Sequence, residues 1–167
     1  MDIEQAKDKF IETWGTVGGE WGINRTMAQI HALLLISPEP ASAEDIMESL
    51  GVSRGNVNMN VRELISWGIV SKVIVKGERK EYFDADRDIH KVAMKIMNER
   101  RKRELLPLLE TLEGLSKIKV KGAEGKSFTK TVNDINTFGQ NVHKLLERLT
   151  KANENWFTGP FIKFITK

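Results

Sequence analysis

Residues 53–70 read SRGNVNMNVRELISWGIV, and this stretch decides the fold. Its apolar side chains share one helical face, at about 100° per residue. They are Val57, Val61 and Leu64, with Ile65 at the edge of the face. Ser53 is a favourable N-cap, and Gly68 stands where a glycine commonly ends a helix. The stretch therefore predicts an amphipathic helix that runs directly into a strand.

The opposite face of this helix is polar in an unusual way. It carries Asn56, Asn58, Met59, Arg62 and Ser66. Asparagine is a poor residue for a helix interior, so its repeated use needs a reason. Base reading supplies one, because Asn pairs with adenine and Arg with guanine, while a helix N-terminus suits a phosphate. We expect a DNA recognition helix with contacts from Ser53, Arg54, Asn56, Asn58, Met59 and Arg62. A capped surface helix with an odd polar face is the alternative.

A short capped helix precedes this stretch. The segment SAEDIMESLG (Ser42–Gly51) predicts a helix over 43–50, with Ser42 and Asp45 as a variant capping box. The preceding SPEPAS (residues 37–42) is expected to be a loop. Two helices separated by a tight turn are typical of a helix-turn-helix.

A basic hairpin follows the recognition helix. The segment IVSKVIVKGERKEYFDA (Ile69–Ala85) predicts two short strands around the turn KGERK. That turn carries Lys76, Arg79 and Lys80 against a single Glu78. Such a tip suits phosphate contact or a narrow minor groove, although charged hairpin tips also serve solubility. Short helix, turn, amphipathic helix and basic hairpin predict a winged helix-turn-helix.

The sequence here resembles the GbsR-type branch of the MarR-like winged-helix repressors. The resemblance covers roughly residues 10–100 and is carried by three stretches. They are SRGNVNMNVRELISWGIV, the upstream GINRTMAQIHALLLIS (Gly22–Ser37) and the downstream KGERKEYFDA. The resemblance implies a homodimeric, ligand-responsive protein that binds double-stranded DNA. Some members of the branch control compatible-solute uptake or synthesis and respond to choline.

Composition sets outer limits on the function. The 167 residues include no cysteine, so disulfides, thiolate catalysis and Cys-type zinc sites are excluded. No apolar run approaches the ~20 residues that span a bilayer, and the first residues do not have the pattern of a signal peptide. We expect a cytoplasmic protein with no membrane partner. His31, His90 and His143 stand far apart, and no catalytic motif is present, so we expect neither an enzyme nor a metal or other cofactor.

Charge is distributed unevenly along the chain. Residues 1–50 hold 3 basic and 9 acidic side chains, whereas residues 51–83 hold 6 and 3. A phosphate-binding surface should be locally basic, as this middle segment is. Residues 115–167 hold 10 and 4, which suits either DNA flanks or a solvated helical surface.

Long apolar helices flank the winged helix. The first has one apolar face, made of Ile3, Ala6, Phe10, Trp14 and Val17. We expect residues 15–22, GTVGGEWG, to break it, and Asn24 or Thr26 to begin the next helix. From Asp86 we expect a long helix that Pro107 kinks or restarts, followed by a loop over 117–127. A last helix over about 128–150 has heptad spacing, which favours a partner helix in this chain or in another.

These patterns define the expected architecture, which is mainly α with a small β-wing. We expect a dimerisation helix over 1–22, a winged helix-turn-helix over 23–86 and a helical dimerisation region over 87–167. The aromatic tail WFTGPFIKFITK is expected to close the same dimer interface. The expected function is a homodimeric DNA-binding transcriptional regulator on a pseudo-palindromic site.

Two other functions remain open from the residues alone. The first is a protein-interaction module, in which the polar helix face meets another protein. The second is a small-molecule sensor with little DNA affinity, whose effector would bind Phe10, Trp14 and Trp21, with Trp156, Phe157 and Phe161 as further candidates. Aromatic residues at helical spacing are more often core residues.

Overall fold

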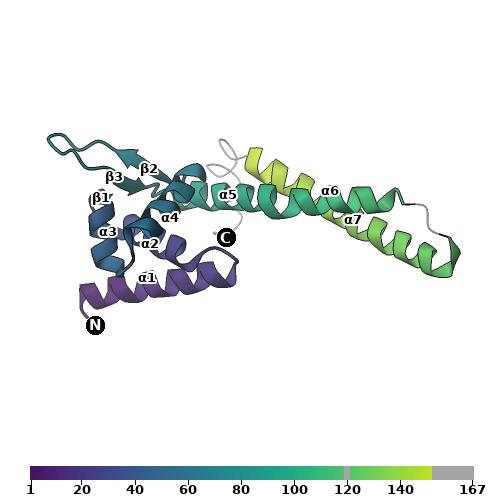
Figure 1. The fold of residues 1–167 in the computed structure, drawn as a ribbon, viewed down its shortest axis with the longest axis horizontal. Helices are drawn as coiled ribbons and strands as arrows, with labels where there is room; N and C mark the ends of the chain where they lie inside the picture. Colours follow the sequence, from purple (N-terminus) through teal and green to yellow (C-terminus); the bar gives the residue numbers. More distant parts are fainter. Residues whose placement is uncertain (119–120, 152–167) are drawn as a thin grey trace, which may run out of the picture. The chain divides into compact units, whose positions relative to one another are not determined.

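The computed structural model describes residues 1–118 and 121–151. The chain forms two compact units, Met1–Val92 and Ala93–Lys167. Both are built mainly of helices, and the first also holds one small antiparallel sheet (Figure 1). The expected fold class, mainly α with a small β-wing, is confirmed. Among the helices in the described ranges, none is both long and apolar enough to cross a bilayer.

The first unit has the element order of a winged helix. Its elements are α1 (Ile3–Glu20), α2 (Arg25–Ile36), β1 (Ala41–Ser42), α3 (Ala43–Leu50), α4 (Arg54–Ser66), β2 (Val70–Val73) and β3 (Tyr82–Ala85). The strand order is β1-β3-β2, and β2 pairs with β3 from Val70↔Ala85 to Val73↔Tyr82. The hairpin β2–β3 is the expected wing. The two-residue strand β1 was not expected, because residues 37–42 read as a loop.

Side-chain caps begin the helices at the predicted residues. The Ser42 hydroxyl accepts from the Asp45 N–H at 3.2 Å, and the Asp45 carboxylate accepts from the Ser42 N–H at 2.8 Å. Asn24 caps α2 by accepting from the Met27 N–H, and Ser53 caps α4 by accepting from the Asn56 N–H. Gly68 lies just beyond α4 with a φ of +71°, a conformation that favours glycine. Local sequence therefore fixes where these helices begin and end.

The core of the first unit lies between α2, α3 and α4. Its most buried large side chains are Ile30, Leu34, Ile46, Val57, Val61, Leu64 and Ile69. The predicted buried face of α4 is confirmed, since Val57, Val61 and Leu64 are all in this set. Phe83 of β3 is buried as well. The apolar pattern thus fixes the orientation of α4 about its own axis and determines which face is exposed to solvent.

The predicted break at residues 15–22 is wrong, because α1 continues to Glu20. A Cβ atom added to Gly18 would lie 2.5 Å from the Cβ of Ala28, and one added to Gly15 would lie 2.5 Å from the Cγ of Gln29. Both glycines are buried where α1 packs along α2. They allow the two helices to approach closely, and that contact offsets their poor helix propensity.

The buried face of α1 also differs from the predicted one. Ile11, Gly15 and Gly18 are buried, whereas Ile3 is 68% exposed and Val17 is exposed too. Ala6, Phe10 and Trp14 are half-buried. The spacing identified an apolar stripe, but the residues that α2 covers lie beside it.

A π-helical turn lies just before Pro107. Helix α5 (Ile89–Arg100) starts three residues later than expected and runs into the turn η1 (Arg101–Leu105), followed by α6 (Leu106–Ser116). In the turn, the Leu106 N–H bonds to the Arg101 carbonyl. Proline lacks an N–H and clashes with the carbonyl four residues earlier, and the wider turn relieves that clash. Pro107 was predicted to kink or restart the helix, and the structure has the second outcome, with α6 starting at Leu106.

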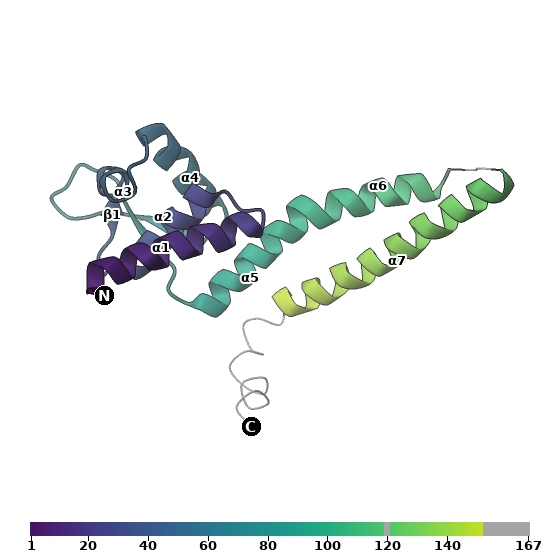
Figure 2. The same ribbon diagram turned by 90° about the horizontal axis from the view of Figure 1, so that it is seen from below.

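The last helix, α7 (Gly122–Lys151), begins six residues before the predicted start. The expected loop over 117–127 is therefore wrong for its second half. Helices α6 and α7 lie side by side (Figure 2). A Cβ atom on Gly139 would lie 2.7 Å from the Leu109 side chain, so one partner of the heptad face belongs to the same chain. The tail 152–167, with its predicted role, lies outside the described residues.

Candidate nucleic-acid interface

Helix α4 presents a row of polar side chains because its apolar face is anchored in the core. Arg54, Asn58 and Arg62 recur every four residues and are exposed, and Met59 beside them is 60% exposed. Ser53 is exposed at the N-terminus of the helix, where its hydroxyl accepts from the Asn56 N–H at 3.3 Å. The structure therefore brings five of the predicted contact residues together on one accessible surface.

Asn56 is placed differently from the other predicted contacts. It is half-buried, and its amide oxygen accepts from the Asn60 amide at 2.6 Å. The same Asn60 amide donates to the Asn56 carbonyl at 2.8 Å, and Asn60 is buried. Asn56 is thus held against its own helix through its amide oxygen. The sequence prediction missed Asn60, although its position one turn from Val57 on the apolar face was a usable signal.

The first turn of α4 is tied to the first turn of α3 by an ion pair. Arg54 donates to the Glu44 carboxylate, and both side chains remain partly exposed. The pKa of Glu44 is lowered by a hydrogen bond from its own backbone N–H and by the bond from Arg54. The positive charge of Lys80 lowers the pKa of both Glu44 and Asp45 further. Two carboxylates of α3 therefore lie near cations of α4 and of the wing.

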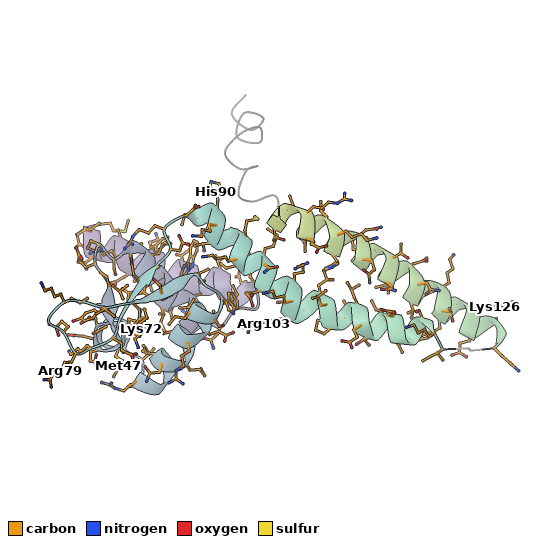
Figure 3. All side chains as sticks on the ribbon, turned by 90° about the horizontal axis from the view of Figure 1, so that it is seen from above. Met47, Lys72, Arg79, His90, Arg103 and Lys126 are labelled. Carbon is orange, nitrogen blue, oxygen red and sulfur yellow. The ribbon has the colours of Figure 1, made fainter. Side chains whose placement is uncertain are left out.

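The wing carries its cations on an exposed loop. Lys76, Arg79 and Lys80 are all exposed, as predicted, and Figure 3 shows Arg79 at the outer part of the hairpin. The turn is closed by a hydrogen bond from the Glu78 N–H to the Val75 carbonyl at 3.1 Å, and Gly77 has a φ of +92°. Lys72, nearer the sheet, forms an ion pair with Glu81. The three tip cations form no ion pair within residues 1–118 and 121–151, so phosphates can reach them.

The three predicted effector residues do not form one cluster. The rings of Phe10 and Trp14 lie 5.5 Å apart, and Trp14 lies 6.3 Å from His31 of α2. Trp21 caps the end of α1 and is 61% exposed, about 10 Å along the helix from Trp14 at 1.5 Å per residue. The packing of Phe10 on Trp14, and of Trp14 against the buried His31, supports the core interpretation for these two side chains.

His31 is an unusual core residue. It is 2% exposed, and its Nε2 atom has no hydrogen-bond partner among the described residues. Burial lowers its pKa to about 4, so the ring is neutral at pH 7. Among the described residues, no three His, Asp or Glu side chains are grouped in a way that could hold a metal ion.

Comparison with known proteins agrees with this geometry. Residues 21–81, which span α2 to the wing, match the family model of the MarR family. The matched segment, about a third of the chain, is therefore similar to the MarR family. A solved structure described as a transcriptional regulator matches with a TM-score of 0.64 at 17% identity, over 90% of this chain and 99% of that one. At this identity the match confirms the winged-helix fold alone.

Two curated relatives extend the similarity beyond residues 21–81. The HTH-type transcriptional regulator YvaV of Bacillus subtilis is 26% identical over 122 residues, which are 65% of this chain and 69% of that protein. The HTH-type transcriptional repressor GbsR of Bacillus subtilis is 27% identical over 89 residues, 53% of this chain and 49% of GbsR. The chain therefore spans about half of GbsR in that match.

Proposed function

We propose that this protein is a sequence-specific DNA-binding transcriptional regulator. The observation that carries the proposal is the exposed row Arg54, Asn58 and Arg62 on a helix whose opposite face is fixed in the core. A rigid helix with base-reading side chains suits the major groove, where Asn and Arg discriminate base pairs. The MarR-type fold and the names of YvaV and GbsR support the same function.

The wing is proposed to supply affinity rather than sequence preference. Its cations Lys76, Arg79 and Lys80 are exposed on an extended hairpin. Long basic side chains contact phosphates, which position a protein on DNA but carry no sequence information directly. In this proposal Arg54 and Ser53, at the N-terminus of α4, also contact phosphate.

We further propose that the protein acts as a homodimer on a pseudo-palindromic operator. In the second unit, Leu108 is 50%, Leu145 is 57% and Phe138 is 71% exposed. Phe138 and Leu145 are seven residues apart and so lie on one side of α7. Large apolar side chains exposed next to one another on a surface usually mark an interface, as expected for Phe138 and Leu145. A two-fold dimer would present two recognition helices to successive major grooves, about 34–36 Å apart.

Repression and membership of the GbsR-type branch belong to the same proposal. They are supported by the three stretches that resemble the branch and by the repressor name of GbsR. A ligand could act on such a dimer by favouring one separation of the recognition helices over another.

Selection of genomic fragments by the purified protein tests the proposal. We expect a small set of fragments that share a two-fold-symmetric motif with half-sites about 10 base pairs apart. Binding to the best fragment should weaken steeply as salt increases, because each neutralised phosphate contributes about −0.9 to the log–log slope. Recovery of fragments without a shared motif would contradict sequence-specific recognition.

A further inference from the structure

Ile74 lies on the arm of the wing with its side chain almost entirely in solvent. It is 91% exposed, the highest value among the large apolar side chains that the structure describes. Its neighbours Val73 and Val75 are half-buried. Strand β2 ends at Val73, so Ile74 is the first residue of the arm beyond the sheet ladder.

The hairpin itself does not require an apolar side chain at this position. The turn is closed by the bond between Glu78 and Val75 and by the positive φ of Gly77. Ladder pairing with β3 ends at Val73. Exposed single apolar residues are common on proteins, so exposure alone identifies no partner. The charged residues around Ile74 indicate which partner it contacts.

Cations surround Ile74 in sequence and along the hairpin. Lys76 stands two residues after Ile74, and Lys72, which pairs with Glu81, stands two residues before it. Arg79 and Lys80 follow on the returning arm. All four are exposed, and Figure 3 shows Lys72 and Arg79 on this hairpin. A DNA groove offers the matching arrangement, because its two edges carry phosphates while the base steps between them are uncharged. An apolar side chain between cations is therefore complementary to a groove.

We propose that Ile74 is an apolar DNA contact that presses against a base step in the minor groove. This inference rests on the proposed DNA-binding function. Minor-groove proteins use isoleucine and similar side chains as wedges that partly unstack a step and bend the duplex. Pyrimidine–purine steps deform most easily and are the expected target. Ile74 would then select DNA by deformability at a position that the recognition helix does not reach.

The test compares Ile74→Ala and Ile74→Thr with two control variants on the selected operator. Ile118→Ala changes another exposed isoleucine, and Lys76→Gln removes a charge from the same wing. Dissociation constants are measured over a range of salt concentrations, and bending is measured by energy transfer between dyes at the duplex ends. Both Ile74 variants should bind about tenfold more weakly and bend the duplex less, because burial of the side chain is lost. Their salt slope should equal that of the original protein, whereas Lys76→Gln should give a slope shallower by about 0.9.

The outcomes separate this inference from the proposed function. If the unsubstituted protein shows no salt-dependent DNA binding, the proposed function fails. If it binds while both Ile74 variants bind and bend DNA as it does, only the wedge is refuted. A slope change like that of Lys76→Gln would also refute it. A lipid surface with anionic headgroups is the alternative partner for an apolar side chain that lies among cations. Ile74-dependent binding to phosphatidylglycerol vesicles, with DNA binding unchanged, would likewise overturn the proposal.

Discussion

Arg54 and Glu44 form an ion pair that joins the first turn of the recognition helix to the first turn of α3. The residues are ten positions apart in sequence and come together only through the fold. Arg54 is also one of the side chains proposed to contact DNA. In the free protein, the Glu44 carboxylate is therefore paired with the Arg54 guanidinium, which a DNA phosphate would otherwise bind.

Glu44→Gln should tighten DNA binding. The substitution keeps a hydrogen-bond acceptor for Arg54 but removes the negative charge that competes with phosphate. We expect about threefold tighter binding to random duplex DNA at low salt, since a single exposed charge has a modest, screened effect. Fluorescence anisotropy with labelled DNA gives the measurement. Glu48→Gln, on the exposed side of the same helix, is the matched control and should leave affinity nearly unchanged. Equal effects of both variants would show that net charge alone is responsible.

The buried His31 should make stability depend on pH. Its pKa in the folded protein is about 4, below the value near 6.5 of an unfolded chain. Below pH 6.5 the unfolded state binds a proton that the folded state does not, so stability falls as the pH decreases towards 4. Between pH 7 and 4.5 this linkage costs about 2 kcal/mol of the free energy of unfolding.

Urea unfolding at several pH values tests this linkage. Between pH 7 and 4.5, the free energy of unfolding of His31→Leu should fall by about 2 kcal/mol less than that of the unsubstituted protein. Met27→Leu, at another buried position of α2, removes no titratable group and should retain the original pH dependence. Parallel pH profiles for the original protein and His31→Leu would show that His31 does not titrate as proposed.

Replacement of the adjacent Gly18 and Gly19 of α1 by alanine should change the free energy of unfolding in opposite directions. A Cβ on Gly18 would lie 2.5 Å from the Ala28 Cβ, whereas one on Gly19 would meet nothing within 4 Å. Gly18→Ala should lower the free energy of unfolding by about 1–3 kcal/mol through overpacking. Gly19→Ala should raise it by up to about 1 kcal/mol through helix propensity. Thermal unfolding of both variants gives the comparison, and equal destabilisation would argue against the close contact of α1 with α2.

A charge on the exposed apolar side of α7 should disrupt the proposed dimer. Phe138 is 71% exposed on a single chain and would be buried between two. At micromolar concentration the original protein should sediment at about twice the 19.0 kDa chain mass, and Phe138→Glu at about that mass. Asn133→Glu, on a different side of the helix, adds the same charge and should remain dimeric. A monomeric original protein would remove the basis for the two-fold operator.

Local sequence was sufficient for the features that local interactions decide. The caps Ser42 and Ser53, the bounds of α3 and the buried face of α4 all follow from residues within one or two helical turns. The wing and the positions of its cations follow from a β-rich run around a basic turn. These features define most of the candidate DNA surface.

Other features depend on contacts between distant residues and could not be predicted from spacing. Glycines in α1 indicate a break until Ala28 and Gln29 of α2 are known to lie against them. The pairing of β1 with β3 and the ion pair of Arg54 with Glu44 also join residues that are distant in sequence. Asn60 could have been found, since its helical position already placed it on the buried side of α4.

The division of labour between recognition helix and wing is the central claim of this account. The most direct test measures the affinity of Arg62→Ala and Lys76→Gln for the operator and for random DNA over a range of salt concentrations. Arg62→Ala should cost about 1–3 kcal/mol on the operator, with little change on random DNA. Lys76→Gln should weaken both complexes and make both salt slopes shallower by about 0.9. If the two variants weaken operator and random DNA in the same proportion, base reading by α4 and phosphate binding by the wing are not separate, and the account is contradicted.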